Sequence, residues 1–284
     1  MAEKLSKHLS KLSKRGPHRV LVGSLDYAGL PGKIYTPSTG NGIPAIAFGH
    51  DWLKDISKYH ATLRHFASWG IAVAAPNTER TLSPNHRGFA ADLESCLQIL
   101  ASVKLGTGQV VVSPQRLGLV GHGMGASAAV LAAASRPGLK GVAALYPSQS
   151  TPPATTAATA ITAPGLVLGM DENPIFDYGN PAEIAAQWGG ICAYREIEGA
   201  THHSLTEDTL FKMLTGAGRT KAKHHELIRG LVTGFLLATL GDEKKYSAFA
   251  QRDAVAKKVV SFSGSELAEK ATQLSTQKIP GLSK

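Results

Sequence analysis

The sequence predicts an α/β fold with a mostly parallel sheet covered by helices on both faces. Short apolar runs bounded by Gly and Pro, typical of strands, alternate with longer segments in which apolar residues recur at helical spacing. Strands that alternate with helices in this way are usually parallel and buried on both faces. The chain has 284 residues, 43% of them hydrophobic and 18% charged, which is the composition of a globular protein. One core domain with extensions at its ends is the simplest interpretation.

The elements follow one another in a regular order. After an N-terminal segment, three short runs broken by Gly and Pro are predicted to be strands, and a helix with apolar spacing follows and stops at Gly70. Strands and helices then alternate up to a Thr-, Ala- and Pro-rich stretch that predicts a loop, after which two more strands flank a helix. The chain from Lys221 is predicted helical up to a polar C-terminal extension that starts at residue 251. The expected strands are 19–25, 32–37, 43–49, 71–76, 117–120, 142–146, 165–170 and 192–199; the expected helices are 56–70, 88–104, 125–135 and 181–188; the expected loop is 151–164.

The N-terminal segment, residues 1–18, is basic and amphipathic. Five Lys and Arg residues stand among the first 15 residues against a single acid, and Leu5, Leu9 and Leu12 share one helical face. Two interpretations stay open. The segment is either an interfacial helix that attaches weakly and reversibly to an anionic membrane surface, or a solvated helix whose leucines pack on the domain.

The composition excludes several classes of protein. The net charge of +9 identifies no partner by itself, and no nucleic-acid-binding motif is present, so we expect no nucleic-acid partner. No apolar run reaches the roughly 18 residues of a membrane span, and the N-terminus lacks the apolar region of a secretory signal. We therefore expect a cytoplasmic protein, peripheral to the membrane if the basic segment binds one. Cys96 lies in a helical pattern and is expected to be a buried free thiol.

One turn resembles the site on which many hydrolases carry their nucleophile. An apolar run from Leu117 to Val120 leads into Gly-His-Gly-Met-Gly, residues 121–125, and then into an alanine-rich helix. This strand, turn and helix order is that of the G-x-S-x-G motif, whose central serine attacks the substrate. The central position here is Gly123. Glycine has no side chain that can attack, so ordinary acyl-enzyme formation at this turn is not expected.

With three further stretches, this turn makes the chain resemble the α/β-hydrolase superfamily, and within it the cutinase and polyester-hydrolase branch related to dienelactone hydrolases. The resemblance runs from about Arg19 to Phe249 and implies an α/β-hydrolase domain over residues 19–250, followed by a polar C-terminal extension, residues 251–284. The three stretches are HFASWGIAVAAPNTERTLSPNHRG (65–88), APGLVLGMDENP (163–174) and IEGATHHS (197–204).

The resemblance assigns the family's catalytic positions to residues of this chain. The nucleophile position is Gly123, the acid position is Asn173 and the base position is His202. An asparagine orients an imidazole but cannot stabilise its positive charge, and replacement of the acid lowers the rate about 10⁴-fold in the best-studied triad. Acidic residues close enough in sequence to substitute for the missing acid are Asp171, Glu172 and Asp177.

The oxyanion hole of the family uses backbone donors, which side-chain changes do not remove. The resemblance places these donors at the N–H groups of Met124 and Trp52, beside the positive end of the helix that starts near Gly125. The Trp52 side chain forms either an apolar wall beside the cleft or part of the core. Ser148 stands where the polyester-hydrolase branch carries an aromatic residue, so we do not expect recognition of aromatic polyesters.

The sequence therefore predicts a catalytically disabled α/β-hydrolase-like protein. Its cleft binds an ester or acyl-lipid ligand, or its surface serves a protein partner in an interaction or regulatory role. One alternative is a weakly active or unconventional carboxylic ester hydrolase, in which His202 activates a water without any serine. A second is a lipid-surface or scaffolding protein whose basic N-terminal helix does the targeting. No cofactor and no metal are expected.

Overall fold

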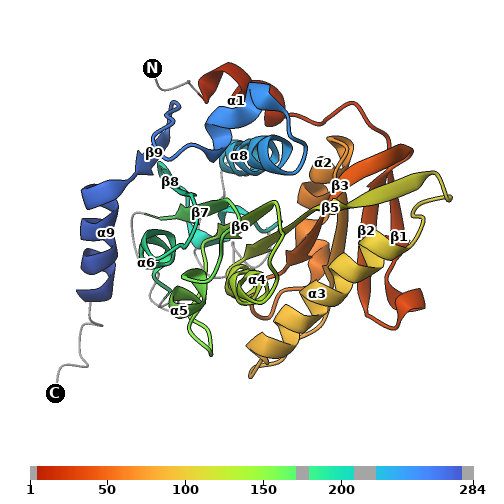
Figure 1. Cartoon of the computed structure of the whole chain (residues 1–284), viewed down its shortest axis with the longest axis horizontal. Helices are drawn as coiled ribbons and strands as arrows, with labels where there is room; N and C mark the ends of the chain where they lie inside the picture. Colours follow the sequence, from red (N-terminus) through yellow and green to blue (C-terminus); the bar gives the residue numbers. More distant parts are fainter. Residues whose placement is uncertain (1–4, 171–178, 208–221, 277–284) are drawn as a thin grey trace.

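The computed structural model describes residues 5–170, 179–207 and 222–276 of the 284-residue chain. Within these residues nine strands form one sheet in the order β1-β2-β4-β3-β5-β6-β7-β8-β9 (Figure 1). The six strands from β4 to β8 along the sheet are parallel to one another, and β1, β2 and β9 are antiparallel to their neighbours. The strands are β1 Val20–Ser24, β2 Gly32–Pro37, β3 Gly40–Gly49, β4 Ala72–Pro76, β5 Val110–His122, β6 Gly141–Leu145, β7 Gly165–Gly169, β8 Cys192–Ile197 and β9 Val259–Phe262.

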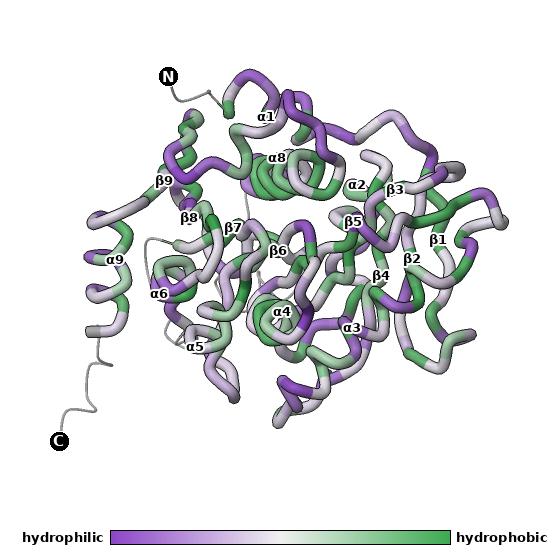
Figure 2. Tube along the Cα trace, viewed as in Figure 1, coloured by the Kyte–Doolittle hydropathy of each residue, from purple (hydrophilic) through white to green (hydrophobic). Residues whose placement is uncertain are grey.

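Helices cover both faces of the sheet. One hydrophobic cluster joins the sheet to α3, α4, α5, α6 and α9, and a second joins the opposite face to α1, α2 and α8. Figure 2 shows α4 and α8 as predominantly hydrophobic and α1 as largely hydrophilic on its outer side. The predicted α/β architecture, covered on both faces, is confirmed. The helices are α1 Ser6–Leu12, α2 His60–Ser68, α3 His86–Ser102, α4 Met124–Ala134, α5 Ala154–Ala158, α6 Pro181–Ala186, α8 Ala222–Thr239 and α9 Gly264–Thr276.

The basic N-terminal helix α1 packs on α8. Leu5 and Leu12 are fully buried and Leu9 is 5% exposed, so the apolar stripe belongs to the core. The approach is close: a Cβ at Gly230 of α8 would lie 2.9 Å from the Leu9 side chain. This arrangement agrees with the second interpretation of the segment, a helix whose leucines pack on the domain. Attachment to an anionic surface stays a prediction, which now depends on the exposed basic side chains because the leucines are not available for insertion.

Two segments contain structure that the sequence pattern did not predict. The expected loop 151–164 includes the short helix α5, and the expected polar extension from residue 251 includes β9 and α9. Strand β9 extends the sheet along β8, and α9 packs on α6 through Leu267, Ala271 and Leu274. These apolar residues lie at i, i+4 and i+7 on an otherwise polar helix. The segment has a polar composition because a single narrow apolar stripe is enough to attach a helix at the edge of the sheet.

Cys96 and Cys192 are both buried free thiols, which confirms the prediction for Cys96. None of the helices in the described ranges has the length and hydropathy that a membrane crossing requires.

Two buried histidines are expected to make the fold acid-sensitive. Burial, and secondly the charge of Arg229, lower the pKa of His65 to about 4, and burial, followed by the charge of His202, lowers that of His122 to about 3. An unfolded histidine titrates near 6.5, so the unfolded chain binds more protons below that pH. The stabilising contribution is complete above about pH 6.5 and is lost as the pH falls toward the folded pKa values. At pH 5 the loss is about 2 kcal/mol for each group.

Urea unfolding at pH 7 and pH 5 measures this loss. The His65 Nε2–H donates to the Leu12 carbonyl at 2.9 Å, a bond that an amide can make as well. The His65→Gln variant should therefore lose about 2 kcal/mol less than the wild type between the two pH values. An equal loss in both proteins contradicts the assignment.

Candidate active site

The turn between β5 and α4 is a tight, glycine-framed elbow. Gly123 caps α4 with φ 54° and ψ −119°, a backbone conformation that side chains adopt only under strain. The flanking glycines allow the turn to pack closely on its neighbours: a Cβ on Gly121 would lie 2.0 Å from the Gly125 carbonyl oxygen, and one on Gly125 would lie 2.2 Å from Gly49 at the end of β3. The local backbone is therefore that of a nucleophile elbow, with a glycine at its central position.

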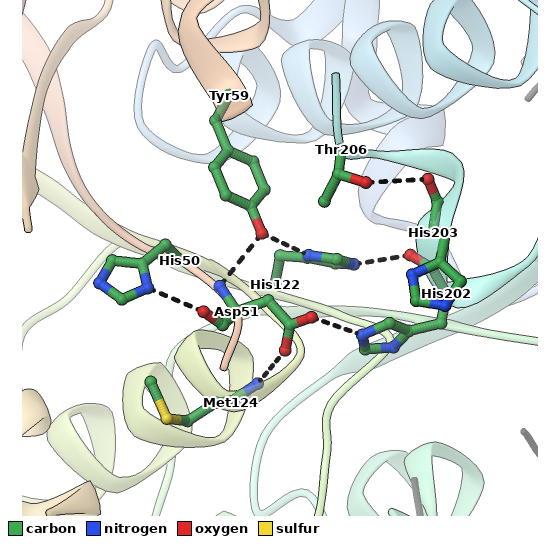
Figure 3. Close-up of polar contacts among 8 residues, drawn as sticks. All are labelled: His50, Asp51, Tyr59, His122, Met124, His202, His203 and Thr206. Carbon is green, nitrogen blue, oxygen red and sulfur yellow. Dashed lines mark hydrogen bonds and ion pairs between the residues drawn. The ribbon is translucent and has the colours of Figure 1, made fainter. Parts of the chain in front are cut away.

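A carboxylate from another loop occupies the space above this glycine. Asp51 follows the end of β3 and is only 6% exposed. Its Oδ1 accepts a hydrogen bond from the Met124 N–H at 3.2 Å, and its Oδ2 lies 2.8 Å from His202 Nε2 (Figure 3). A Cβ built on Gly123 would lie 1.9 Å from Asp51 Oδ1 and 2.9 Å from His202 Cε1. Asp51 thus fills the volume that a side chain at position 123 would need.

The environment of Asp51 favours its ionised form. Burial by itself would raise the pKa of the carboxyl, but the charge of His202 and the hydrogen bond from its ring lower that pKa to well below its usual range. The Met124 N–H lowers it further, because a donor to a carboxylate stabilises the charge. Both carboxylate oxygens consequently act as acceptors at neutral pH. Asp51 and His202 are both buried, so removal of either side chain leaves a buried hydrogen-bonding atom of the other without this partner, which is destabilising.

A second network fixes the backbone on either side of this pair (Figure 3). The His122 Nε2–H donates to the His202 carbonyl oxygen at 2.8 Å, which leaves Nδ1 as an acceptor. The Tyr59 hydroxyl donates to that Nδ1 at 2.8 Å and accepts from the Asp51 N–H at 3.1 Å. Tyr59 and His122 are fully buried, and burial keeps the pKa of His122 low, so the ring stays neutral. One chain of three hydrogen bonds therefore connects the Asp51 loop to the His202 loop.

Asp51, His122 and His202 are residue types that bind metals, and their ligand atoms lie within 4.8 Å of one another. Both ring nitrogens of His122 are already hydrogen-bonded, and His202 Nε2 is bonded to Asp51. A metal ion would have to break several of these buried bonds. The bonds that already join these side chains therefore fit a polar network better than a metal centre.

Removal of the Tyr59 hydroxyl should destabilise the site. In the Tyr59→Phe variant the buried Asp51 N–H and His122 Nδ1 both lose their hydrogen-bond partner. Each unsatisfied buried group costs about 1–3 kcal/mol, so the free energy of unfolding should fall by about 2–5 kcal/mol. Urea denaturation measures the change. Tyr27→Phe is a matched control, because Tyr27 is 99% exposed; an equal effect in the two variants contradicts the network.

The structure brings together three of the positions expected from the sequence. Gly123, Met124 and His202 meet at the carboxyl end of the sheet, whereas Asn173 lies outside the described residues. The sequence predicted that the Met124 N–H would be an oxyanion donor. In the structure this N–H already donates to Asp51. Trp52 is 45% exposed and donates its indole N–H to the Thr81 carbonyl at 3.2 Å, so its side chain is not part of the core.

Sequence reasoning missed Asp51. The available signal was an acidic residue two positions after the end of a predicted parallel strand, in Gly-His-Asp-Trp, at the sheet edge where ligands bind in open α/β folds. The serines near the site are otherwise engaged. Ser127 donates to the Ser148 carbonyl, and the Ser204 hydroxyl accepts from the Thr201 N–H at 2.8 Å. Neither side chain is on the elbow.

Comparison with known proteins agrees with this geometry. The model of the PETase family, described as PET hydrolase-like, matches residues 10–206. The bis(hydroxyethyl) terephthalate hydrolase of Streptomyces coelicolor is 31% identical over 207 residues, with 67% of this chain and 62% of that protein covered. Cutinase est1 of Thermobifida alba is 28% identical over 185 residues (63% and 60% covered), and cutinase 1 of Thermobifida cellulosilytica is 27% identical over 175 residues (60% and 64% covered).

The chain thus spans 60% to 64% of the length of these curated relatives. The family model covers well over half of the chain, including the elbow, the Asp51 loop and His202. Together with the mostly parallel sheet and its glycine elbow, this match shows that the chain belongs to the PET hydrolase-like family of α/β-hydrolases.

Proposed function

We propose that this PET hydrolase-like chain is a catalytically disabled member of its family that acts through binding, as an interaction or regulatory protein. The observation that carries the proposal is the Asp51 carboxylate. It occupies the nucleophile's volume above Gly123 and bonds to both Met124 and His202.

Serine-dependent ester hydrolysis needs a nucleophile, a base that takes its proton and donors for the developing oxyanion. Gly123 supplies no nucleophile. His202 Nε2 and the Met124 N–H are the groups expected to serve as base and donor, and both are bonded to Asp51. Asp51 thus fills the volume of the serine side chain and also bonds to the groups expected to serve as base and oxyanion donor. These three contacts by one side chain support the loss of catalysis.

The same contacts bear on the ligand. An ester or acyl carbonyl that approached the elbow would have to displace a buried carboxylate from Met124, whose N–H is the donor that would hold the carbonyl oxygen. Of the two binding roles, a protein partner is therefore better supported than an ester or acyl-lipid ligand at the elbow. A cytoplasmic location stays part of the proposal.

An unconventional hydrolase is the competing candidate. It would use His202 to activate a water, with no covalent intermediate. Since Nε2 of His202 lies 2.8 Å from Asp51 Oδ2, the ring would first have to leave its buried partner, and the geometry favours this route less.

Fluorophosphonate labelling and hydrolysis of short p-nitrophenyl esters test the proposal. We expect no labelling, because these probes react with an activated serine, and no turnover above buffer. An active cutinase, assayed in parallel, shows that the reagents work. Saturable turnover that disappears in the His202→Ala variant would overturn the proposal in favour of the unconventional hydrolase.

A further inference from the structure

A basic cavity lies away from the elbow, between α1, the start of α8 and the turn before β9. It has a volume of about 250 Å³ and shares no residue with the Asp51–His202 site. Its wall carries four lysines from these three elements, Lys14, Lys223, Lys257 and Lys258, and a single acid, Glu226.

Among the residues that the structure describes, no acidic side chain forms an ion pair with the lysines of this cavity. Within the part of the chain that the structure describes, the ion pairs involve other residues, and none includes Lys14, Lys223, Lys257 or Lys258. The wall therefore has a formal charge of +3, four lysines less one glutamate. Like charges gathered from three separate elements repel one another, and a bound anion would relieve that repulsion.

Hydroxyl groups also line the cavity, beside the apolar residues Leu9, Leu227 and Ala256. Ser6 and Ser10 of α1 and Ser13 at its C-cap line the same cavity. The Ser13 hydroxyl donates to the Leu9 carbonyl at 2.8 Å, so its oxygen is held in place. Ammonium groups with adjacent hydroxyls are the donors that bind phosphate oxygens through charge-assisted hydrogen bonds. Small-molecule pockets usually have volumes of about 300–1,000 Å³, so this cavity suits a small phosphorylated group rather than a nucleotide.

We propose that this cavity, formed by Ser10, Lys14, Lys223, Lys257 and Lys258, is a binding site for a phosphate-bearing anion. The phosphate belongs to a small soluble metabolite or to the headgroup of an anionic lipid. In either case the same lysines bind it, and one of the basic residues of the N-terminal segment, Lys14, contributes to the site. The site is independent of the proposed loss of catalysis.

The test uses two charge-matched variants of the full chain. The cavity variant is Lys14→Gln/Lys257→Gln, and the control variant is Lys7→Gln/Lys11→Gln, which removes two exposed lysines of α1 that do not line the cavity. All four lysines are exposed, so both variants should fold, and thermal unfolding checks this. Calorimetric titration with inorganic pyrophosphate and with glycerol 3-phosphate probes soluble ligands. Co-sedimentation with vesicles of phosphatidylcholine, with or without phosphatidic acid, probes a lipid headgroup.

We expect one of these probes to bind the wild type, and the cavity variant to bind it at least tenfold more weakly, while the control variant changes less than twofold. Added salt should weaken the binding. Cavity-dependent binding of pyrophosphate or glycerol 3-phosphate assigns a soluble ligand, and cavity-dependent binding of phosphatidic acid vesicles alone assigns a lipid. The proposal is overturned if no probe binds the wild type, or if the control variant weakens binding as much as the cavity variant does.

Discussion

The Gly123→Ser/Asp51→Ala variant is expected to label with fluorophosphonate and to hydrolyse short esters, whereas Gly123→Ser alone should do neither. In the single variant the new side chain meets the Asp51 carboxylate, since a Cβ at position 123 lies 1.9 Å from Oδ1. Truncation of Asp51 removes this clash and releases both His202 Nε2 and the Met124 N–H. The serine then has a base and an oxyanion donor within reach.

The residue at the predicted acid position, Asn173, is expected to limit the rate of ester hydrolysis that the double variant gains. Loss of the acid costs about 10⁴-fold in a complete triad, so the double variant should be slow, and addition of Asn173→Asp should increase its rate by orders of magnitude. The labelling yield and the rate on p-nitrophenyl acetate are the measurements, and Asp51→Ala alone is the control for non-specific hydrolysis. If the triple variant folds and stays inert on a broad panel of esters, His202 does not act as the base. If Gly123→Ser alone is as active as the double variant, Asp51 does not block the elbow.

The second large effect is on stability. Gly123→Ala should lower the free energy of unfolding by several kcal/mol, because the added Cβ clashes with a buried carboxylate and the residue has φ +54°. Asp51→Ala should cost about 2–5 kcal/mol, because it leaves two buried donors, the His202 Nε2–H and the Met124 N–H, without their acceptor, at about 1–3 kcal/mol each. In the double variant the clash is gone, so its loss should be smaller than the sum of the two single losses by about 1–3 kcal/mol.

Urea denaturation of the wild type, both single variants and the double variant completes this cycle. A control cycle combines Asp51→Ala with Gly138→Ala, because Gly138 also has a positive φ but has nothing within 4 Å of a built Cβ. In this control cycle the losses in free energy of unfolding from Asp51→Ala and Gly138→Ala should be additive. Additive losses in the Gly123 cycle as well would show that the Asp51 side chain does not occupy the space above the elbow.

Much of the fold follows from the sequence because its signals are local. Apolar runs with Gly and Pro at their ends place the parallel strands, and helical spacing stopped at Gly70 places the helix before β4. The glycines at 121 and 125 likewise indicate the elbow, because a Cβ at either position would clash with neighbouring backbone. The glycine at position 123, where the G-x-S-x-G motif has a serine, is also visible without a structure.

The segments at both ends were harder to predict. The leucines of α1 have the same pattern whether they enter a membrane or pack on α8, and only their burial decides between the two. The residues after 251 are mostly polar, yet β9 pairs with β8 because the sheet offers an open edge there. Pattern alone does not reveal a partner that is distant in the sequence.

The sequence by itself determined the α/β-hydrolase fold, the position of the elbow and the absence of a serine from it. Only the tertiary structure decided what fills the vacant space. Asp51 and His202 are 151 positions apart, and no local pattern couples them. They meet because Asp51 follows β3 and His202 follows β8, two strands of the same parallel sheet, so their loops lie on one edge; β5, the neighbour of β3, brings Met124 to that edge. At that edge the buried carboxylate is stable only because His202 and Met124 satisfy it and because Gly123 leaves room for it.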